Sequence, residues 1–398
     1  MVPAIYFTPF RGIIRPSGRG FMDFESKYFK TIDWVIVCVL IGFGIYSYIG
    51  ISGASPHLSL EGTQMLWYCI GFVFLTIVLL FDYNHIGNFT YIFYGIGILL
   101  LVGVLFTEPI NNTTSWYNLG FFSFQPAELM KIITIMTLAK YLSKKVEQEE
   151  KPFERLIELI PIFAIIGAPM LLILIQPDLG NAVVFTGILI SMMIVGGVKG
   201  RHFALFGALA GSFFGFMTYL YQFNQNLFFK IIKSYQWDRF VFWVNPDLDP
   251  GGKGFQLKQS LIAIGSGQLM GKGINAGTQA RFGWVPVGES DFIFTVIAEE
   301  LGFLGASLLI FLFFLLVYRM VRIAMDAKDP FGTYLVSGII GMFVFQIFEN
   351  IGMTIQLMPI TGITLPFISY GGSSLVTNFI IIGLVLNVGM RRKKLMFD

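Results

Sequence analysis

Long uncharged apolar runs recur from residue 32 to residue 389, and they constrain the fold more than any other feature of the chain. A run of about 17 to 25 apolar residues is long enough to cross a membrane as a helix. Of all side chains 55% are hydrophobic and only 13% are charged, whereas soluble domains carry about 25% charged residues. An ordinary soluble protein is therefore excluded. The sequence predicts an all-α polytopic membrane protein.

Ten runs have the length and composition of transmembrane helices. They lie near 32–51, 66–81, 91–107, 127–142, 156–175, 181–198, 203–222, 291–317, 332–354 and 370–389. The fourth is the weakest, because Glu128 and Lys131 lie near its beginning. The first 31 residues contain no apolar run suited to a cleavable signal, so we expect the first span to be retained. Met1 and Met22 are both candidate start residues.

Lysine and arginine are distributed unevenly among the short loops. They precede the first predicted span and follow the fourth, sixth, eighth and tenth. None occurs in loops 52–65, 108–126, 176–180 and 355–369. Because basic residues mark cytoplasmic loops, both termini are predicted to be cytoplasmic. Membrane topology accounts for these basic residues, so nucleic-acid binding has no support.

The spans divide the chain into five parts. These are a cytoplasmic N-terminal segment (1–31), helices one to seven (32–222), a large extracytoplasmic loop (223–290), helices eight to ten (291–390) and a basic cytoplasmic tail (391–398). Loops as long as 223–290 are usually functional or disordered. This one contains Trp237, Trp243, Trp284 and an amphipathic stretch. We therefore expect short helices on the outer membrane surface.

The ionisable side chains of the spans all fall in the predicted outer half of the membrane. Such residues are costly in lipid and are functional candidates by default. Glu128 and Lys131 are three residues apart, so they share a helix face and can pair. This pair is either structural or the polar wall of a ligand cavity. Asp178, in a short outer turn, either caps the next helix or belongs to a site.

Asp291 lies where the large loop joins the eighth span, and two roles are open for it. It can cap the helix, or it can act as a general base if partial burial raises its pKa. Glu299 and Glu300 lie about two turns deeper, where a buried hydrogen-bonding role is at least as plausible as chemistry. No nucleotide-binding loop and no metal-ligand spacing of histidines occurs. An enzyme of this kind would need a substrate that is already activated, such as a lipid-linked pyrophosphate.

Five ordered motifs are recognisable. They are Ser-Trp-Tyr-Asn-Leu-Gly at 115–120 with Phe-Gln-Pro-Ala-Glu-Leu-Met-Lys at 124–131, Gln-Pro-Asp-Leu-Gly at 176–180, the glycine-rich stretch 271–279, Ser-Asp-Phe-Ile-Phe at 290–294 with Ala-Glu-Glu-Leu-Gly at 298–302, and the closing segments 359–362, 365–367 and 369–374. Together they resemble the SEDS family (shape, elongation, division and sporulation proteins). The matches run from about residue 30 to the C-terminus. Within the family, the segment that begins at Pro359 is more similar to RodA-type elongation proteins than to the division branch.

The resemblance implies a peptidoglycan glycosyltransferase that polymerises lipid II into glycan strands at the outer face of the bacterial cytoplasmic (inner) membrane. A class B penicillin-binding protein, which crosslinks the strands, is the implied partner. Asp291 matches the catalytic aspartate of the family. The implied substrate-binding residues are Trp116, Gln125, Glu128, Lys131, Asp178, Gln279, Ser373 and Ser374. No cofactor is certain; a divalent cation (Mg or Mn) is the alternative to Lys131 for offsetting charge on the departing pyrophosphate.

Three departures from the family pattern weaken the expectation of an auxiliary acid. Glu289 stands where a His is frequent, Gly283 where a carboxylate is common, and Ala127 in place of a Ser. Two other functions stay open. A lipid II flippase would favour charges near the midplane and a repeated helix architecture, neither of which the sequence shows. A non-catalytic scaffold that activates the penicillin-binding protein would tolerate replacement of Asp291, Glu128 and Asp178.

Overall fold

The computed structural model describes residues 31–392, except 56, 58, 109–113, 119, 121–122, 149–152 and 250. The long helices are α2 (Trp34–Ala54), α3 (Leu60–Leu80), α5 (Thr90–Gly103), α6 (Pro126–Glu147), α7 (Ile160–Ile175), α8 (Leu179–Val195), α9 (Gly200–Phe223), α14 (Ile293–Met325), α15 (Pro330–Thr354) and α16 (Gly372–Met390). The short elements are α4 (Tyr83–Asn88), η1 (Val104–Phe106), η2 (Leu156–Leu159), α10 (Gln225–Ile231), α11 (Ser234–Val244), η3 (Pro246–Leu248), α12 (Lys253–Gly267) and α13 (Thr278–Arg281). Strands β1 (Tyr117–Asn118) and β2 (Ser123–Phe124) pair antiparallel, with Tyr117 opposite Phe124.

Each predicted span coincides with one long helix. Seven of these helices in the described part of the chain are long and apolar enough to cross a membrane: α2, α3, α7 with its preceding turn η2, α9, α14, α15 and α16. Helices α5 (with η1) and α8 are apolar but shorter. Helix α6 carries a buried charged pair in its first turns and lysines in its last turn. The chain is a multi-pass helical membrane protein, whereas the count of ten spans and their orientation stay predictions.

Two helix boundaries differ from prediction in ways that matter for the site. Helix α3 begins at Leu60, six residues before the predicted start, because polar residues continue the helix beyond its apolar run. One of them, Gln64, is buried and donates to the carbonyl oxygen of Ser369 at 3.0 Å. Helix α14 begins at Ile293. Asp291 therefore lies in the turn before that helix, outside the spanning segment. Of the predicted terminal segments 1–31 and 391–398, residues 1–30 and 393–398 lie outside the described residues.

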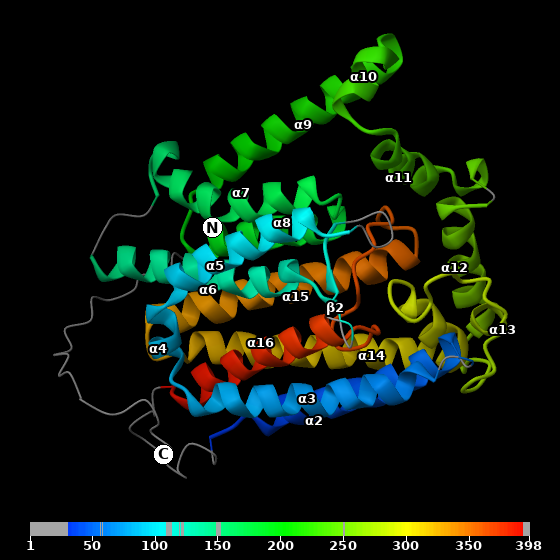
Figure 1. The fold of residues 1–398 in the computed structure, drawn as a ribbon, viewed down its shortest axis with the longest axis horizontal. Coiled ribbons are helices and arrows are strands. Elements are labelled where there is room, and N and C mark those ends of the chain that lie inside the picture. The colour runs from blue at the N-terminus through cyan, green and yellow to red at the C-terminus, as the bar shows by residue number, and fades with distance from the viewer. Residues whose placement is uncertain are drawn as a thin grey trace.

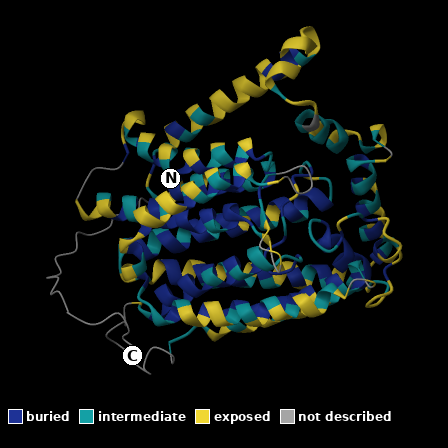
Figure 2. Ribbon diagram, in the orientation of Figure 1, coloured by how far each residue is buried: buried dark blue, intermediate teal, exposed yellow. Residues whose placement is uncertain are grey.

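The long helices other than α9 lie side by side in one bundle (Figure 1). Helix α16 packs against α3, α14 packs between α2 and α15, and α15 also contacts α6 and α8. Helix α16 is buried along most of its length. Figure 2 shows buried residues on the faces that meet inside the bundle and exposed ones on the outer faces. Many of those exposed residues are large and apolar, as at Leu99 and Phe314, which suits surroundings of lipid.

The predicted large loop forms short helices, as expected. In Figure 1, α9 and α10 extend away from the bundle, and α11, α12 and α13 follow the end of the bundle at which α2 ends and α3 begins. We call this the site end. Helix α12 packs against α14, and α13 contacts α2. The large loop thus covers part of the site end, although its predicted position on a membrane surface stays a prediction.

Helix α14 is interrupted at Gly302, whose backbone angles (φ 65°, ψ −165°) are not helical. The segment 268–273 of the large loop supplies the missing hydrogen-bond partners. Phe303 N–H donates to the carbonyl oxygen of Gln268 at 2.8 Å, and Gly273 N–H donates to that of Glu300 at 3.0 Å. A Cβ on Gly302 would lie 2.2 Å from the backbone nitrogen of Gly271. Only a glycine allows this close approach.

Candidate functional site

The turn before α8 places Asp178 against the start of α6. Asp178 caps α8, because its Oδ1 accepts from the backbone N–H of Asn181 at 3.1 Å. Its Oδ2 accepts from Gln125 Nε2 at 2.8 Å. Gln125, the residue before α6, donates its backbone N–H to Ser373 Oγ at the start of α16, at 3.3 Å. The predicted cap is therefore present, and Gln125 joins the Asp178 turn and the start of α16, two motifs that are distant from it in the sequence.

The predicted pair on α6 is buried. Lys131 Nζ lies 2.8 Å from both carboxylate oxygens of Glu128. Only 1% of the Lys131 side chain and 5% of the Glu128 side chain are exposed. Burial of two charges is costly unless they pair with good geometry, so each residue makes the other tolerable. The pair follows Gln125 by one turn of the same helix, and it places an ammonium group near the site end.

Asp291 does not cap α14. The N-cap residue is Phe292, with no side-chain cap. Asp291 Oδ1 accepts one hydrogen bond, from Ser290 Oγ at 3.0 Å, and the carboxylate forms no ion pair with a described residue. Burial raises the pKa of the Asp291 carboxyl; the hydrogen bond from Ser290 and the positive charge of Arg239 oppose that shift, and the negative charges of Glu289 and Asp178 add to it.

The segment 359–363 joins the Asp178 turn to the Asp291 turn. A Cβ on Gly180, in the first turn of α8, would lie 3.0 Å from the carbonyl oxygen of Thr361. Asn350, near the end of α15, donates its Nδ2 to the carbonyl oxygen of Asp291 at 2.9 Å and to that of Ile363 at 2.7 Å. The side-chain amide of Asn350 therefore fixes the Asp291 turn relative to the segment 359–363.

Arg239 is a site residue that the sequence analysis does not identify. It lies on α11, and its Nη1 donates to the carbonyl oxygens of Ile360 at 2.9 Å and Thr361 at 2.8 Å. Its charge also acts on Asp291. Its sequence position gives little indication of this role. Basic residues in short loops indicate membrane orientation, but long loops are exempt from that rule. Arg239 fixes the large loop to the segment beside the carboxylate.

The structure does not bring every predicted residue to this group. The backbone N–H of Gln279 donates to Glu299 Oε1 at 2.9 Å, on the α13 side of α14. Ser374 Oγ donates within its own turn, to the carbonyl oxygen of Gly371 at 3.1 Å. Trp116 is half-buried before β1, and its carbonyl oxygen accepts from Thr107 Oγ1 at 3.2 Å. Substrate contacts of these three residues stay predictions.

Glu299 is buried and accepts several hydrogen bonds, which is one of the two roles that the sequence leaves open for it. Its Oε1 lies 2.6 Å from Lys272 Nζ, and its Oε2 accepts from the backbone N–H of Ala280 at 3.2 Å. It therefore ties the glycine-rich stretch 271–279 and α13 to α14. The described residues contain no group of three or more His, Cys, Asp or Glu side chains that could hold a metal ion. Lys131 and Arg239 are two cations that hydrogen bonds fix in this region.

Gly362 allows a test of how closely the segment 359–363 must approach Asp291. Its φ is +79°, and a Cβ there would lie 3.3 Å from Asp291 Oδ2. We expect Gly362→Ala to strain the backbone by about 1–2 kcal/mol and to displace the carboxylate, which lowers turnover about 10- to 100-fold. The rate of the reaction that the purified protein catalyses measures this loss of turnover. Gly197→Ala is the matched control, since Gly197 has a φ of +75° with open space around it. Equal losses in both variants would show that only backbone strain matters.

Comparisons with known proteins identify the family. The model of a family of cell cycle proteins, which comprises FtsW, RodA and SpoVE, matches residues 30–394. Stage V sporulation protein E of Bacillus subtilis is 38% identical over 328 residues, which cover 82% of this chain and 85% of the relative. Peptidoglycan glycosyltransferase RodA of Treponema pallidum is 29% identical and covers 94% and 99% of the two chains.

A solved structure has the same fold. It was described as the structural coordination of polymerisation and crosslinking by a peptidoglycan synthase complex. The similarity has a TM-score of 0.76 at 29% identity and covers 92% of this chain and 99% of the solved one. The resemblance found in the sequence motifs is confirmed. This chain belongs to the FtsW, RodA and SpoVE family of cell cycle proteins, the SEDS family.

Proposed function

We infer that this chain is a peptidoglycan glycosyltransferase that polymerises lipid II. Relatives over nearly the full length bear that activity in their names. The observation in the structure that carries the inference is Asp291, a partly buried carboxylate with one hydrogen-bond donor, beside a segment held by Arg239 and Asn350. A carboxylate with a raised pKa and no counter-ion of its own is suited to accept a proton from a hydroxyl.

The topology we propose places this site at the outer, extracytoplasmic face of the membrane. All ten long helices cross the cytoplasmic (inner) membrane, both termini are cytoplasmic, and the large loop is extracytoplasmic. Basic residues support this arrangement, since Lys144, Lys145 and Arg391 lie at the end of the bundle opposite to Asp291. The site end then faces the side from which lipid-linked substrate is delivered.

In the mechanism we propose, Asp291 removes the proton from the 4-hydroxyl of the GlcNAc of an incoming lipid II. The oxygen attacks the anomeric carbon of the MurNAc at the end of the growing chain, and the bond from that carbon to the pyrophosphate breaks. The α-linkage becomes β in one inversion. Asp178 and Gln125 fix the start of α6 and α8 around the sugars. Positioning of two bound substrates supplies a large part of the remaining acceleration.

Charge on the departing pyrophosphate must be offset within the site. Lys131 can do so if a phosphate oxygen competes with Glu128 for its ammonium group, since a charge-assisted hydrogen bond to phosphate is as favourable as the one to a carboxylate. A divalent cation, Mg or Mn, bound together with the substrate is the other candidate.

We also propose a partner and a biological role. The solved structure with the same fold belongs to a complex that both polymerises and crosslinks, which supports a class B penicillin-binding protein as partner. The segment that begins at Pro359 supports a role in cell elongation rather than division or sporulation. Rescue of rod shape, but not of septation, in cells depleted of their own elongation protein would agree with that role.

Polymerisation of purified lipid II tests the proposed activity. The complex with its partner, whose transpeptidase serine is blocked, should produce glycan strands. Transfer of labelled lipid II between leaflets of vesicles, without polymer, would instead indicate a flippase. Polymer formed only by the partner, with every Asp291 variant as effective as the wild type, would indicate a scaffold.

The polymerisation rate is expected to fall as the pH falls through the pKa of Asp291, because a general base acts in its deprotonated form. Burial places this pKa above the ordinary value. The charge of Arg239 lowers it, so Arg239→Gln should move the acid limb of the pH–rate profile to higher pH. Arg239→Lys, which keeps the charge, is the matched control. A limb that stays in place in Arg239→Gln would contradict the assignment of that limb to Asp291.

A further inference from the structure

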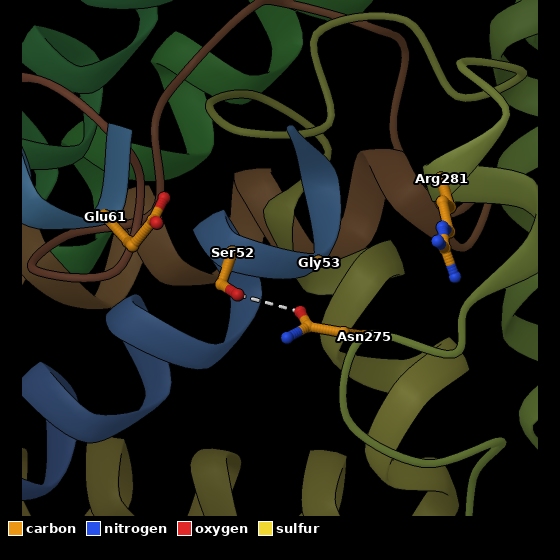
Figure 3. Close-up of a pocket in the computed structure, with 5 residues that line it drawn as sticks. All are labelled: Ser52, Gly53, Glu61, Asn275 and Arg281. Carbon is orange, nitrogen blue, oxygen red and sulfur yellow. Dashed lines mark hydrogen bonds between the residues drawn. The ribbon is translucent and has the colours of Figure 1, made fainter. Parts of the chain in front are cut away.

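A pocket opens at the site end. It lies between the last turn of α2, the first turn of α3 and the loop that carries α13. Its volume is about 230 Å³, and it is lined by Ser52, Gly53, Glu61, Asn275 and Arg281 (Figure 3). Four of these residues carry polar side chains, and none takes part in the proposed mechanism. The space suits a polar group of about the size of one amino acid.

The two charged residues of this pocket do not neutralise each other. Among the residues that the structure describes, Glu61 and Arg281 form neither an ion pair nor a side-chain hydrogen bond. Glu61 Oε2 is buried, and no described residue forms a hydrogen bond with it. Figure 3 shows the two side chains on opposite sides of the hydrogen bond from Ser52 Oγ to Asn275 Oδ1, which is 2.8 Å long.

This separation defines what the pocket can bind. A buried carboxylate oxygen without a donor is costly, so a ligand that donates to Glu61 would be favoured. The exposed guanidinium of Arg281, which no described carboxylate pairs with, presents donors that match a carboxylate in a bidentate arrangement. A simple cation would be repelled by the positive charge of Arg281, and a simple anion would be repelled by the negative charge of Glu61. A ligand that carries an ammonium group and a carboxylate at separate positions satisfies both residues.

The pocket adjoins the turn that carries Asp291. Ser55, the residue after α2, donates its Oγ to Glu289 Oε2 at 3.2 Å. Gly53 approaches α14 so closely that a Cβ there would lie 2.1 Å from Glu300 Oε1. The last turn of α2 therefore connects this pocket to the turn that carries Asp291, at the same end of the bundle.

We propose that the pocket binds the peptide carried by the lipid-linked substrate, with a peptide carboxylate at Arg281 and a free amine at Glu61. The inference rests on the proposed function, because it assigns to that substrate a second point of contact. Peptidoglycan peptides bear free carboxylates and, at a diamino acid, a free amine. The pocket then selects substrates by their peptide, while the Asp291 turn acts on their sugars.

Kinetics with three forms of lipid II test the proposal: the complete form, one with amidated peptide carboxylates, and one with an acetylated amine. For the wild type, each modification should raise KM about ten-fold, the effect of losing one charged hydrogen bond. Arg281→Gln should raise KM for complete lipid II by the same factor and should no longer respond to amidation. Glu61→Gln should in the same way no longer respond to acetylation. Lys258→Gln, a change of an exposed lysine outside the pocket, is the control and should behave as the wild type.

Three outcomes would contradict the proposal or its basis, and they can be told apart. If the wild type polymerises none of the substrates, the proposed function itself is wrong. If the wild type polymerises all three with equal KM, the function stands and the peptide site does not. If Arg281→Gln loses the same factor on every substrate and still discriminates as the wild type does, Arg281 has a structural role and the peptide site is again excluded.

Discussion

Replacement of Asp291 by Asn is expected to abolish glycan polymerisation while the protein stays folded. Removal of a general base lowers rates about 10²- to 10⁴-fold. Asn keeps the size of the side chain and can still accept from Ser290, and the Asn350 amide bonds to the backbone of residue 291 rather than to its carboxylate. Glycan strands formed from purified lipid II by the complex, with crosslinking blocked, measure the loss.

The matched control is Asp247→Asn, which removes an exposed carboxylate from the same large loop. It should polymerise as the wild type does. Equal amounts of glycan from the wild type and Asp291→Asn would mean that this carboxylate only shapes the turn before α14, and that the base lies elsewhere.

Replacement of Lys131 by Met is expected to lower the free energy of unfolding by about 3–5 kcal/mol, because Glu128 would then be a buried charge without its partner. Thermal unfolding in detergent measures this. Loss of both charges in Glu128→Gln with Lys131→Met should restore most of the stability, since exchange of a complete buried pair for neutral residues is often neutral or better.

The double variant also separates the two roles considered for the pair. A restored fold without polymerisation would assign the Glu128–Lys131 pair to the reaction, whereas restored activity would make the pair purely structural. Lys258→Met removes one partner of an exposed ion pair with Asp247, 2.7 Å long, and should cost about 0–1 kcal/mol. A similar small cost for Lys131→Met would contradict the burial that the structure shows.

The positions of the long helices could be predicted because lipid demands uninterrupted apolar runs. Helix α6 was the weakest prediction for the same reason, since its first turns carry two charges that become tolerable only as a pair. The early start of α3 could not be predicted, because Gln64 is stabilised by the carbonyl oxygen of Ser369, 305 residues away in the chain. The pattern of apolar and polar residues around position 64 cannot predict a contact with so distant a part of the chain.

The candidate site could be predicted in part. Depth in the membrane and motif resemblance both point to Asp178, Glu128 and Asp291. The hydrogen bond from Gln125 to Asp178 joins two loops that no periodicity relates, and it appears only when α6 and α8 pack. Arg239 could not be predicted, because a cation in a long loop does not indicate membrane orientation. Its role also depends on two backbone carbonyl groups in another part of the chain.

The interruption of α14 at Gly302 leaves backbone groups on both sides of the break for the large loop. The carbonyl oxygens of Glu299 and Glu300 accept from the loop before the break, and the N–H groups of Phe303 and Leu304 donate to it after the break. The first turns of α14 also pack in the main core of the bundle, through Ile293 and Ile297. One glycine therefore lets a single helix serve the bundle by its side chains and the large loop by its backbone. The turn that carries Asp291 precedes a helix anchored on both sides.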